Sequence, residues 1–269
     1  MANDTQIQDL IRQVQSNSKY QSITPSVIRR LAEDALTKGF KGKSAIKYVR
    51  NKCHQIGGAY FKKKMDFAGI SREIENLPCD LESKDVRQFC VKAMELHSST
   101  AERLPILDSF FETCLAPVAP VTSVLDLACG LNPFSIPWMP LASGFTYTAC
   151  DIYEDMLGVL QSFFSHFEVN GIAQPCDLTD HIPQAHAQVA FFLKSIPCLE
   201  QVDKMISISV LERLQTDHIL VSYPVHSLGG RDKGMPDFYR EHFSRLISDK
   251  SWQIREFLFS SELAFLVSK

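Results

Sequence analysis

The sequence predicts an α/β protein in which a helical N-terminal region, residues 1–115, precedes a sheet-containing domain, residues 116–269. Up to about residue 115, apolar residues recur at helical spacing in one segment after another. After the Ala- and Pro-rich run at residues 116–120, short apolar stretches alternate with helical segments. That alternation is typical of an α/β domain.

The N-terminal region is expected to contain several amphipathic helices, and the third of them should carry a basic face. In that helix Lys43, Lys47 and Arg50 recur at helical spacing, away from the apolar positions, and form a basic ridge. The expected helices are Asp4–Val14, a second from Thr24-Pro25 toward Gly39, Ser44–Gln55, Phe67–Leu77, Asp85–Leu96, and one from the capping box at residues 99–102 to about Cys114.

The second region is expected to alternate strands with helices and to end in an antiparallel hairpin. Asp151 and Asp177 should each lie at a strand end. Helices are expected around residues 155–167 and 200–214. The expected strands are residues 124–127, 145–150, 188–193 as the third strand, 218–222 as the fourth, and a hairpin of 252–259 and 263–267 joined at 260–262.

The charge of the chain is distributed unevenly. The whole chain has a net charge of −3, but residues 12–64 contain thirteen Lys and Arg and only two acidic residues, a net charge of +11. A single lysine-rich run is usually a solvated helix face. A block this basic on a mildly acidic protein indicates a polyanion-binding region, and nucleic acid is the expected partner.

Targeting signals and disulfide patterns are not evident. No apolar run reaches the roughly 18–20 residues of a membrane span, and the N-terminus lacks the basic-then-apolar order of a signal peptide. The eight cysteines are scattered without CxxC pairs or clustered histidines. We therefore expect reduced thiols, no metal site, no membrane association and a cytoplasmic location.

The turn that follows the strand at residues 124–127 carries the first chemical signal. The strand ends with Asp126-Leu127, and the small residues Ala128 and Gly130 would let backbone N–H groups approach a ligand closely. Asp151 ends the next strand 25 residues after Asp126, near the interval at which an acidic residue binds ribose hydroxyls. Asp177 could accept a hydrogen bond from an adenine amino group.

Each acidic residue also has a simpler explanation. Asp151 taken alone fits a helix N-cap, and Asp177 fits a surface loop. Three acidic strand ends in order nevertheless favour a nucleoside cofactor. S-adenosylmethionine (SAM) fits the glycine pattern and the C-terminal hairpin better than a nicotinamide cofactor does.

Five segments carry the most distinctive motifs of the chain and run in order over about four-fifths of it: His54–Tyr60, Leu96–Arg103, Leu125–Pro133, Phe192–Lys194 and Val221–Met235. The combination of CGLNP with SLGGRDKGM is their most specific part. Together these segments resemble one family, the Arm/Rmt group of aminoglycoside-resistance ribosomal RNA methyltransferases.

The resemblance implies a seven-stranded, Rossmann-like class I domain that binds SAM, with a helical N-terminal extension that docks on the small ribosomal subunit. Arg103 is expected to pair with the methionine carboxylate of SAM. The implied cofactor-binding residues are Tyr60, His97, Ser98, Arg103, Ala128, Gly130, Asp151, Asp177, Leu178 and Lys194. The expected RNA-binding residues are Lys43, Lys47, Arg50, His54, Lys62, Lys63, Arg231, Lys233 and Met235.

The implied reaction is methylation of guanine N7 in the decoding site of 16S rRNA, on the assembled 30S subunit, which confers aminoglycoside resistance. Guanine N7 carries a lone pair and no proton, so no general base is required. In the loop at residues 227–235, Arg231 and Lys233 would hold phosphate or the guanine edge, and Met235 would pack against the flipped base. A flexible surface loop is the simpler explanation for this segment. We expect a monomer without an obligate protein partner.

Two other functions remain compatible with the sequence. One is methylation of a nearby adenine at N1, and the other is a non-catalytic RNA-binding factor for ribosome assembly. The loss of two glycines from the usual D-x-G-x-G-x-G pattern, where Ala128 and Asn132 stand, keeps the second alternative open.

Overall fold

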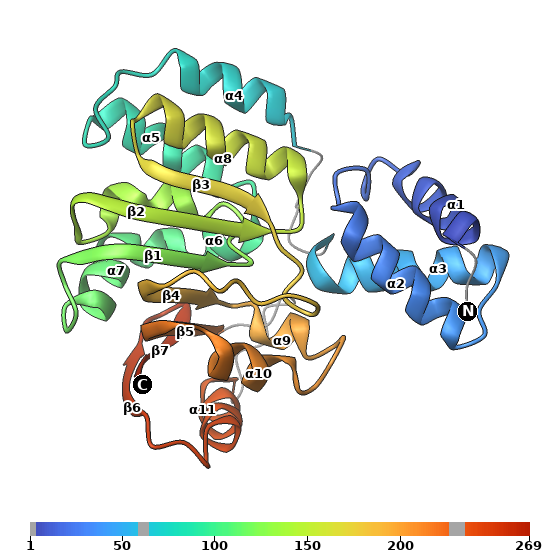
Figure 1. Cartoon of the computed structure of the whole chain (residues 1–269). Helices are drawn as coiled ribbons and strands as arrows, with labels where there is room; N and C mark the ends of the chain where they lie inside the picture. The colour runs from blue at the N-terminus through green and yellow to red at the C-terminus, as the bar shows by residue number, and fades with distance from the viewer. Residues whose placement is uncertain (1–3, 59–64, 226–234) are drawn as a thin grey trace.

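The computed structural model describes residues 4–58, 65–225 and 235–269, which form a seven-stranded sheet with helices on both faces (Figure 1). The order across the sheet is β3-β2-β1-β4-β5-β7-β6, and among these strands β7 alone points opposite to the other six. The predicted fold class is thereby confirmed. The strands are β1 (Val121–Leu127), β2 (Leu141–Asp151), β3 (Asn170–Pro175), β4 (Ala187–Leu193), β5 (Thr216–Pro224), β6 (Gln253–Leu258) and β7 (Glu262–Ser268).

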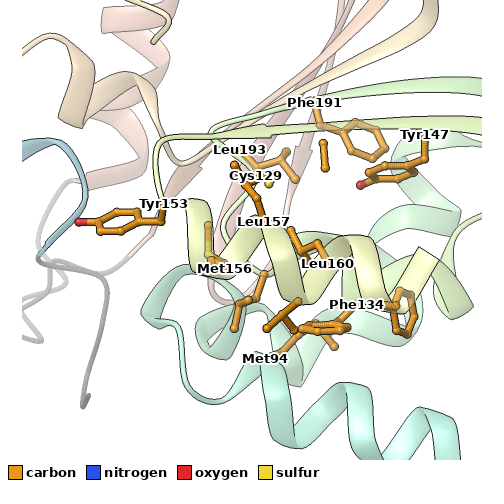
Figure 2. Packing of buried hydrophobic residues seen from close by; sticks show 14 of the residues in the cluster. Met94, Cys129, Phe134, Tyr147, Tyr153, Met156, Leu157, Leu160, Phe191 and Leu193 are labelled. Atoms are coloured by element: carbon orange, nitrogen blue, oxygen red, sulfur yellow. The ribbon is translucent and has the colours of Figure 1, made fainter. Parts of the chain in front are cut away.

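The sheet separates two groups of buried apolar side chains. On β1, Val124 belongs to one cluster and Leu125 to the other, as the alternation of side chains along a strand requires. Helices α4, α5, α7 and α8 contribute to the first cluster, and α9, α10 and α11 to the second. In Figure 2, Leu157 and Leu160 of α8 lie in the first cluster together with Phe134. The helices are α1 (Asp4–Gln15), α2 (Pro25–Thr37), α3 (Gly42–Cys53), α4 (Phe67–Glu75), α5 (Lys84–Met94), α6 (Ser98–Arg103), α7 (Leu107–Leu115), α8 (Glu154–His166), α9 (Ile196–Leu199), α10 (Ile206–Arg213) and α11 (Met235–Leu246).

Helices α1, α2 and α3 form a group of their own beside the carboxyl ends of the parallel strands (Figure 1). Each helix buries one apolar face, which includes Ile7 on α1, Ile28 and Leu31 on α2, and Val49 on α3. Helix α2 begins at Pro25, where the missing N–H costs no helical hydrogen bond. Helix α3 continues into a π-helical turn, η1 (His54–Gly58).

Two predicted helices are wrong in extent. The helix expected from the capping box to Cys114 is divided into α6, a 3-10 turn at Leu104–Ile106 and α7, and the N-cap of α6 is His97. Pro105 explains the break, because a proline inside an α-helix lacks the N–H and crowds the preceding turn. The helix expected at residues 200–214 begins only at Ile206, after the short α9.

The numbering of the predicted strands also needs correction. The strand expected as the third is β4 and the one expected as the fourth is β5, because β3 precedes them. Strand β3 lies at the sheet edge, is at most half-buried and contains Gly171 and Pro175, so it lacks a clear strand pattern. Helix α11 was not expected, although Tyr239 and Phe243 are buried at helical spacing.

No helix in the described part of the chain has both the length and the apolar character needed to cross a bilayer.

Candidate functional site

A pocket opens at the carboxyl ends of β1, β2 and β4, where the strand order reverses between β1 and β4. In open α/β sheets, this switch point is where ligands bind. Its polar side chains include two buried acidic residues, Asp126 and Asp151, and two buried cations, Arg103 and Lys194. The residues around it are Val27, Ile56, Gly57, His97, Ser99, Thr100, Arg103, Asp126, Ala128, Cys129, Asn132, Asp151, Ile152, Tyr153, Met156, Cys176, Asp177, Leu178, Thr179, Leu193, Lys194, Ser195, Cys198 and Leu199.

The turn after β1 has an unusual backbone that brings its N–H groups toward β2. Ala128 and Gly130 have φ angles of 49° and 52°, in the left-handed region. The N–H of Gly130 donates to Asp151 Oδ2 at 2.9 Å, and the N–H of Ile152 donates to Asp151 Oδ1 at 2.7 Å. Burial raises the pKa of Asp151, and these N–H donors oppose the rise. Asp151 therefore joins the turn to the end of β2.

Two features favour glycine at position 130: its φ angle is positive, and the His97 ring leaves no room for a side chain. A Cβ at this position would lie 2.7 Å from Cε1 of His97. Both Gly130→Ala and a substitution at another glycine of positive φ strain the backbone, but Gly130→Ala also crowds His97. It is expected to lower the free energy of unfolding by about 1–3 kcal/mol more for that reason, and to weaken SAM binding. Gly144→Ala is the matched control, because Gly144 has φ 71° but nothing within 4 Å of its Cβ position. Chemical denaturation and SAM titration of both variants provide the measurement; equal effects would contradict the role of the His97 contact.

Charged side chains form a buried network beside the turn, centred on Glu262. Arg103 donates to Glu262 through Nη2 at 2.7 Å and through Nε, and through Nη1 to Asn132 Oδ1 at 2.7 Å. Lys194 Nζ lies 3.2 Å from Glu262 and 3.0 Å from Glu102. Burial would raise the pKa of Glu262, but Arg103 and Lys194 hold it below its usual value. Glu262 therefore stays ionised and fixes both cations at the pocket wall.

This network changes two expectations. Glu262 was assigned to the hairpin turn, but it is the first residue of β7 and is fully buried. Arg103, which is expected to pair with the methionine carboxylate, uses its Nε and one Nη2 hydrogen to bind Glu262. Arg103 has five N–H donors, so hydrogens on its Nη atoms remain for a second carboxylate. That pairing stays a prediction.

Asp126, at the end of β1, accepts hydrogen bonds from Asn132 Nδ2 at 2.8 Å and from the Tyr147 hydroxyl at 2.7 Å. Burial raises its pKa to about 7, although both hydrogen bonds and Arg103 act to lower it. In the unfolded chain an aspartate has a pKa of about 3.9. At pH values between about 4 and 7, Asp126 therefore keeps its proton in the folded protein, whereas the same side chain is ionised in the unfolded chain.

The contribution of Asp126 to stability should consequently fall as the pH rises from about 4 to 7, by up to about 4 kcal/mol. Asp126→Asn removes the ionisation and keeps an oxygen acceptor. The stability of this variant relative to the wild type is expected to increase between pH 5 and pH 8, as measured by denaturant unfolding at each pH. A constant difference across that range would show that Asp126 does not titrate there.

Asp177 follows β3 and lies at the opposite side of the pocket from the charged network. Its Oδ1 accepts from the N–H of Thr179 at 3.0 Å and from the Thr179 hydroxyl at 2.5 Å. Its Oδ2 accepts from Arg30 Nε at 2.7 Å. The neighbouring Leu178 is buried and also lines the pocket.

The structure brings most of the predicted cofactor residues together. His97, Arg103, Ala128, Asp151, Asp177, Leu178 and Lys194 line one pocket. Ser98 and Gly130 do not line it: Ser98 is buried in the first turn of α6, and Gly130 acts through its N–H on Asp151. Tyr60, Lys62, Lys63, Arg231 and Lys233 lie outside the described residues.

Several residues at the pocket were not predicted. Val27, Ile56 and Gly57 form part of its wall from the N-terminal helices, and Asn132 and Glu262 order its charged side. Gly57 and Asn132 belong to two of the segments that carry the family resemblance, so these segments could have identified both as pocket residues. Glu262 offered none, because its partner Arg103 is 159 residues away in the chain.

Three of the predicted RNA-binding residues line one groove on α3, which we call the basic groove. Lys43 and Lys47 are exposed, and Arg50 is half-buried because its Nη2 donates to the carbonyl of Gln13 at 2.6 Å. His54 is exposed one turn further on, 3.0 Å from Lys19 Nζ. Met235 begins α11 and is half-buried against the second apolar cluster. The residues of the basic groove are Asn17, Tyr20, Lys43, Ile46, Lys47, Arg50 and Asn51.

Curated relatives of nearly full length share one name. The chain is 29% identical over 269 residues to the 16S rRNA (guanine(1405)-N(7))-methyltransferase of Micromonospora rosea, covering 99% of this chain and 98% of the relative. It is 30% identical to the protein of that name from Frankia casuarinae, covering 100% and 96%. The crystal structure of 16S rRNA methyltransferase RmtF in complex with S-adenosyl-L-homocysteine (SAH) covers both chains completely, with 27% identity and a TM-score of 0.82.

These likenesses agree with the resemblance drawn from the motifs and confirm it. Residues 16–266 match the family described as ribosomal RNA methyltransferase (FmrO), which is almost the whole chain. The chain therefore belongs to the FmrO family of ribosomal RNA methyltransferases.

Proposed function

We propose that this protein transfers a methyl group from SAM to N7 of guanine 1405 of 16S rRNA, within the assembled 30S subunit, and thereby confers aminoglycoside resistance. Relatives of nearly full length carry the name of this reaction. The observation that carries the proposal is the pairing of two features on one side of the molecule. A pocket with acidic strand ends lies at the sheet switch point, and the helices that close one of its walls carry the basic groove.

The residues of the pocket fit SAM by their chemistry. Asp151 offers buried carboxylate oxygens at the end of β2, suited to ribose hydroxyls, and Asp177 offers an acceptor suited to the adenine amino group. Leu178 supplies an apolar contact beside it. Arg103 and Lys194 place positive charge where a carboxylate would be held. When bound, SAM supplies a methyl group on a positively charged sulfur.

The chain itself has to orient and enclose the reacting atoms. Guanine N7 has an in-plane lone pair and no proton, so no side chain is needed as a base. Alignment of the nucleophile with the methyl group and exclusion of water account for the catalytic effect that we assign to the protein. A guanine within an RNA helix must first be flipped, at a cost of roughly a few kcal/mol. Phosphate contacts at the basic groove would offset that cost.

The enzymatic test uses tritiated SAM with purified 30S subunits and, in parallel, protein-free 16S rRNA. We expect label in the 16S rRNA of the subunits and much less in the free RNA. No incorporation together with intact subunit binding would favour the non-catalytic assembly factor. Label in free RNA at the same rate would contradict recognition of the assembled subunit.

Other features of the proposal rest on the sequence. We propose that residues 1–115 include the region that docks on the ribosome and that residues 116–269 form the SAM-binding domain. Helices α4 to α7 of the first region also pack on the sheet or line the pocket of that domain. Arg231 and Lys233 are assigned to phosphate or the guanine edge, and Met235 is assigned to packing against the flipped guanine. We also propose that the protein is a monomer, that it acts in the cytoplasm and that it needs no obligate protein partner.

A further inference from the structure

The N-terminal helices contact the cofactor pocket through an ion pair that the proposed reaction does not use. Arg30 on α2 donates to Asp177 through Nε at 2.7 Å and through Nη2 at 3.4 Å. The side chain of Arg30 is 26% exposed and that of Asp177 is 10% exposed, so the pair is largely shielded from solvent. Arg30 Nε donates to Asp177 Oδ2, and Arg30 Nη2 donates more weakly to Oδ1, which also accepts from the N–H and the hydroxyl of Thr179. The orientation of Asp177 therefore depends on the position of α2.

A second set of contacts connects the same N-terminal segment to the end of β2. The N–H and the hydroxyl of Thr24 both donate to the carbonyl of Ile152, at 2.8 and 3.0 Å. The N–H of Glu154 donates to the carbonyl of Ser22 at 2.8 Å. In Figure 2 the ring of Tyr153 points away from α8 toward the N-terminal segment. These contacts involve the three residues that directly follow Asp151.

The wall of the pocket is completed by the N-terminal segment. Val27 of α2 and Ile56 and Gly57 of η1 line the pocket together with Asp151 and Asp177. The fit at Gly57 is close, since a Cβ there would lie 2.7 Å from a ring carbon of Tyr153. A nucleoside in this pocket would touch both the sheet and the helices that carry the basic groove.

We propose that Arg30 is a positioning residue that orients Asp177 for the cofactor and couples occupancy of the pocket to docking of the α1–α3 helices on RNA. The coupling part rests on the proposed function. A bound cofactor holds α2 and η1 against the sheet, so less conformational freedom is lost when the basic groove meets the RNA. By linkage, RNA docking must tighten cofactor binding by the same factor.

A purely structural role for Arg30 makes different predictions. A partly exposed ion pair stabilises a protein by about 0–1 kcal/mol, and a merely structural pair would leave the two binding sites independent of one another. The decisive quantity is therefore the ratio of 30S affinities with and without SAH. That ratio is insensitive to the loss of a single RNA contact, which would affect both affinities equally.

The test compares the wild type, Arg30→Gln, Arg30→Lys and Arg29→Gln. Arg29 is the matched control, because it adjoins Arg30 on α2 but pairs with the exposed Asp4. SAH affinity is measured by calorimetry, and 30S affinity is measured with and without saturating SAH. Thermal unfolding establishes that each variant is folded.

We expect Arg30→Gln to weaken SAH binding by about 3- to 10-fold. In the wild type and Arg29→Gln, SAH should tighten 30S binding by about 5-fold or more. Arg30→Gln should abolish this effect, and Arg30→Lys, which keeps the charge without the guanidinium fork, should restore part of it.

An SAH affinity of Arg30→Gln within twofold of the wild type would overturn the positioning role. An SAH effect on 30S affinity of equal size in the wild type and Arg30→Gln would overturn the coupling. If Arg30→Gln fails to fold, Arg30→Met, which removes the charge and keeps a long side chain, decides both points by the same criteria. If the wild type binds SAH but no 30S subunit, the proposed function fails, and the SAH titrations alone decide the role of Arg30.

Discussion

Replacement of Lys43, Lys47 and Arg50 with glutamate is expected to lower the affinity for the 30S subunit by at least about 100-fold. Each of these side chains lines the basic groove, where a cation that contacts a phosphate releases counterions from the RNA. Charge reversal replaces this attraction with repulsion. The affinity for SAH, measured without subunits, is expected to stay within about twofold of the wild type, because none of the three residues lines the cofactor pocket.

Two further variants make this result interpretable. Arg50 also donates to the carbonyl of Gln13 on α1, so its loss can loosen the helical group; the double variant of Lys43 and Lys47 leaves that bond intact. Reversal of Arg72, Lys84 and Lys92, which are exposed on α4 and α5, makes the same change in net charge away from the groove. Filter binding of 30S subunits at several salt concentrations provides the measurement. Persistent binding at moderate salt, or an equal loss in the control, would contradict the role of the basic groove.

Asp151→Ala is expected to weaken SAM binding by about 10- to 100-fold, the effect of losing one or two hydrogen bonds to a charged group. The buried carboxylate would no longer be present to accept from the ribose hydroxyls, and the N–H groups of Gly130 and Ile152 would lose their acceptor. Binding to 30S subunits in the absence of cofactor should remain nearly intact, because Asp151 lies in the pocket and not in the basic groove.

Asp151→Asn keeps one oxygen acceptor and should fall between the wild type and Asp151→Ala. Asp155→Ala removes an exposed carboxylate from the first turn of α8, outside the pocket, and should bind SAM normally. Calorimetric titration with SAM and thermal unfolding of each variant provide the data. Equal losses of SAM binding and cofactor-free 30S binding in Asp151→Ala would contradict the separation of the two sites.

Local sequence patterns predicted the parts of the fold that are determined by interactions between residues close together in the chain. The turn at residues 128–133, the acidic strand ends and the start of α2 at Pro25 could be recognised because short-range rules of backbone chemistry fix them. The hydroxyl of Thr24, the residue before this helix, makes no cap hydrogen bond, because it donates to the carbonyl of Ile152. Strand β3 could not, because an edge strand that is half-exposed lacks the apolar alternation of a buried one. Pro105 is itself a signal for a helix break. The prediction of one continuous helix gave more weight to the capping pattern at residues 99–102 than to this proline.

The candidate site was predictable to the extent that its residues follow strand ends or belong to the family motifs. Asp151 and Asp177 met the first condition, and His97 and Lys194 met the second. The pairing of Arg103 with Glu262 and of Arg30 with Asp177 could not be predicted, because these contacts join residues 159 and 147 positions apart. Such pairs are set by the packing of the whole sheet and not by sequence spacing.

The chemical identity of the methylated atom tests the central claim most directly. After incubation of 30S subunits with the protein and SAM, the 16S rRNA is extracted, reduced with borohydride, treated with aniline and mapped by primer extension. N7 methylation makes the nucleotide cleavable under this treatment, so we expect a new strand break at guanine 1405 that requires SAM. A primer-extension stop at a neighbouring adenine without reduction or aniline would instead indicate adenine N1 methylation and contradict the proposed reaction.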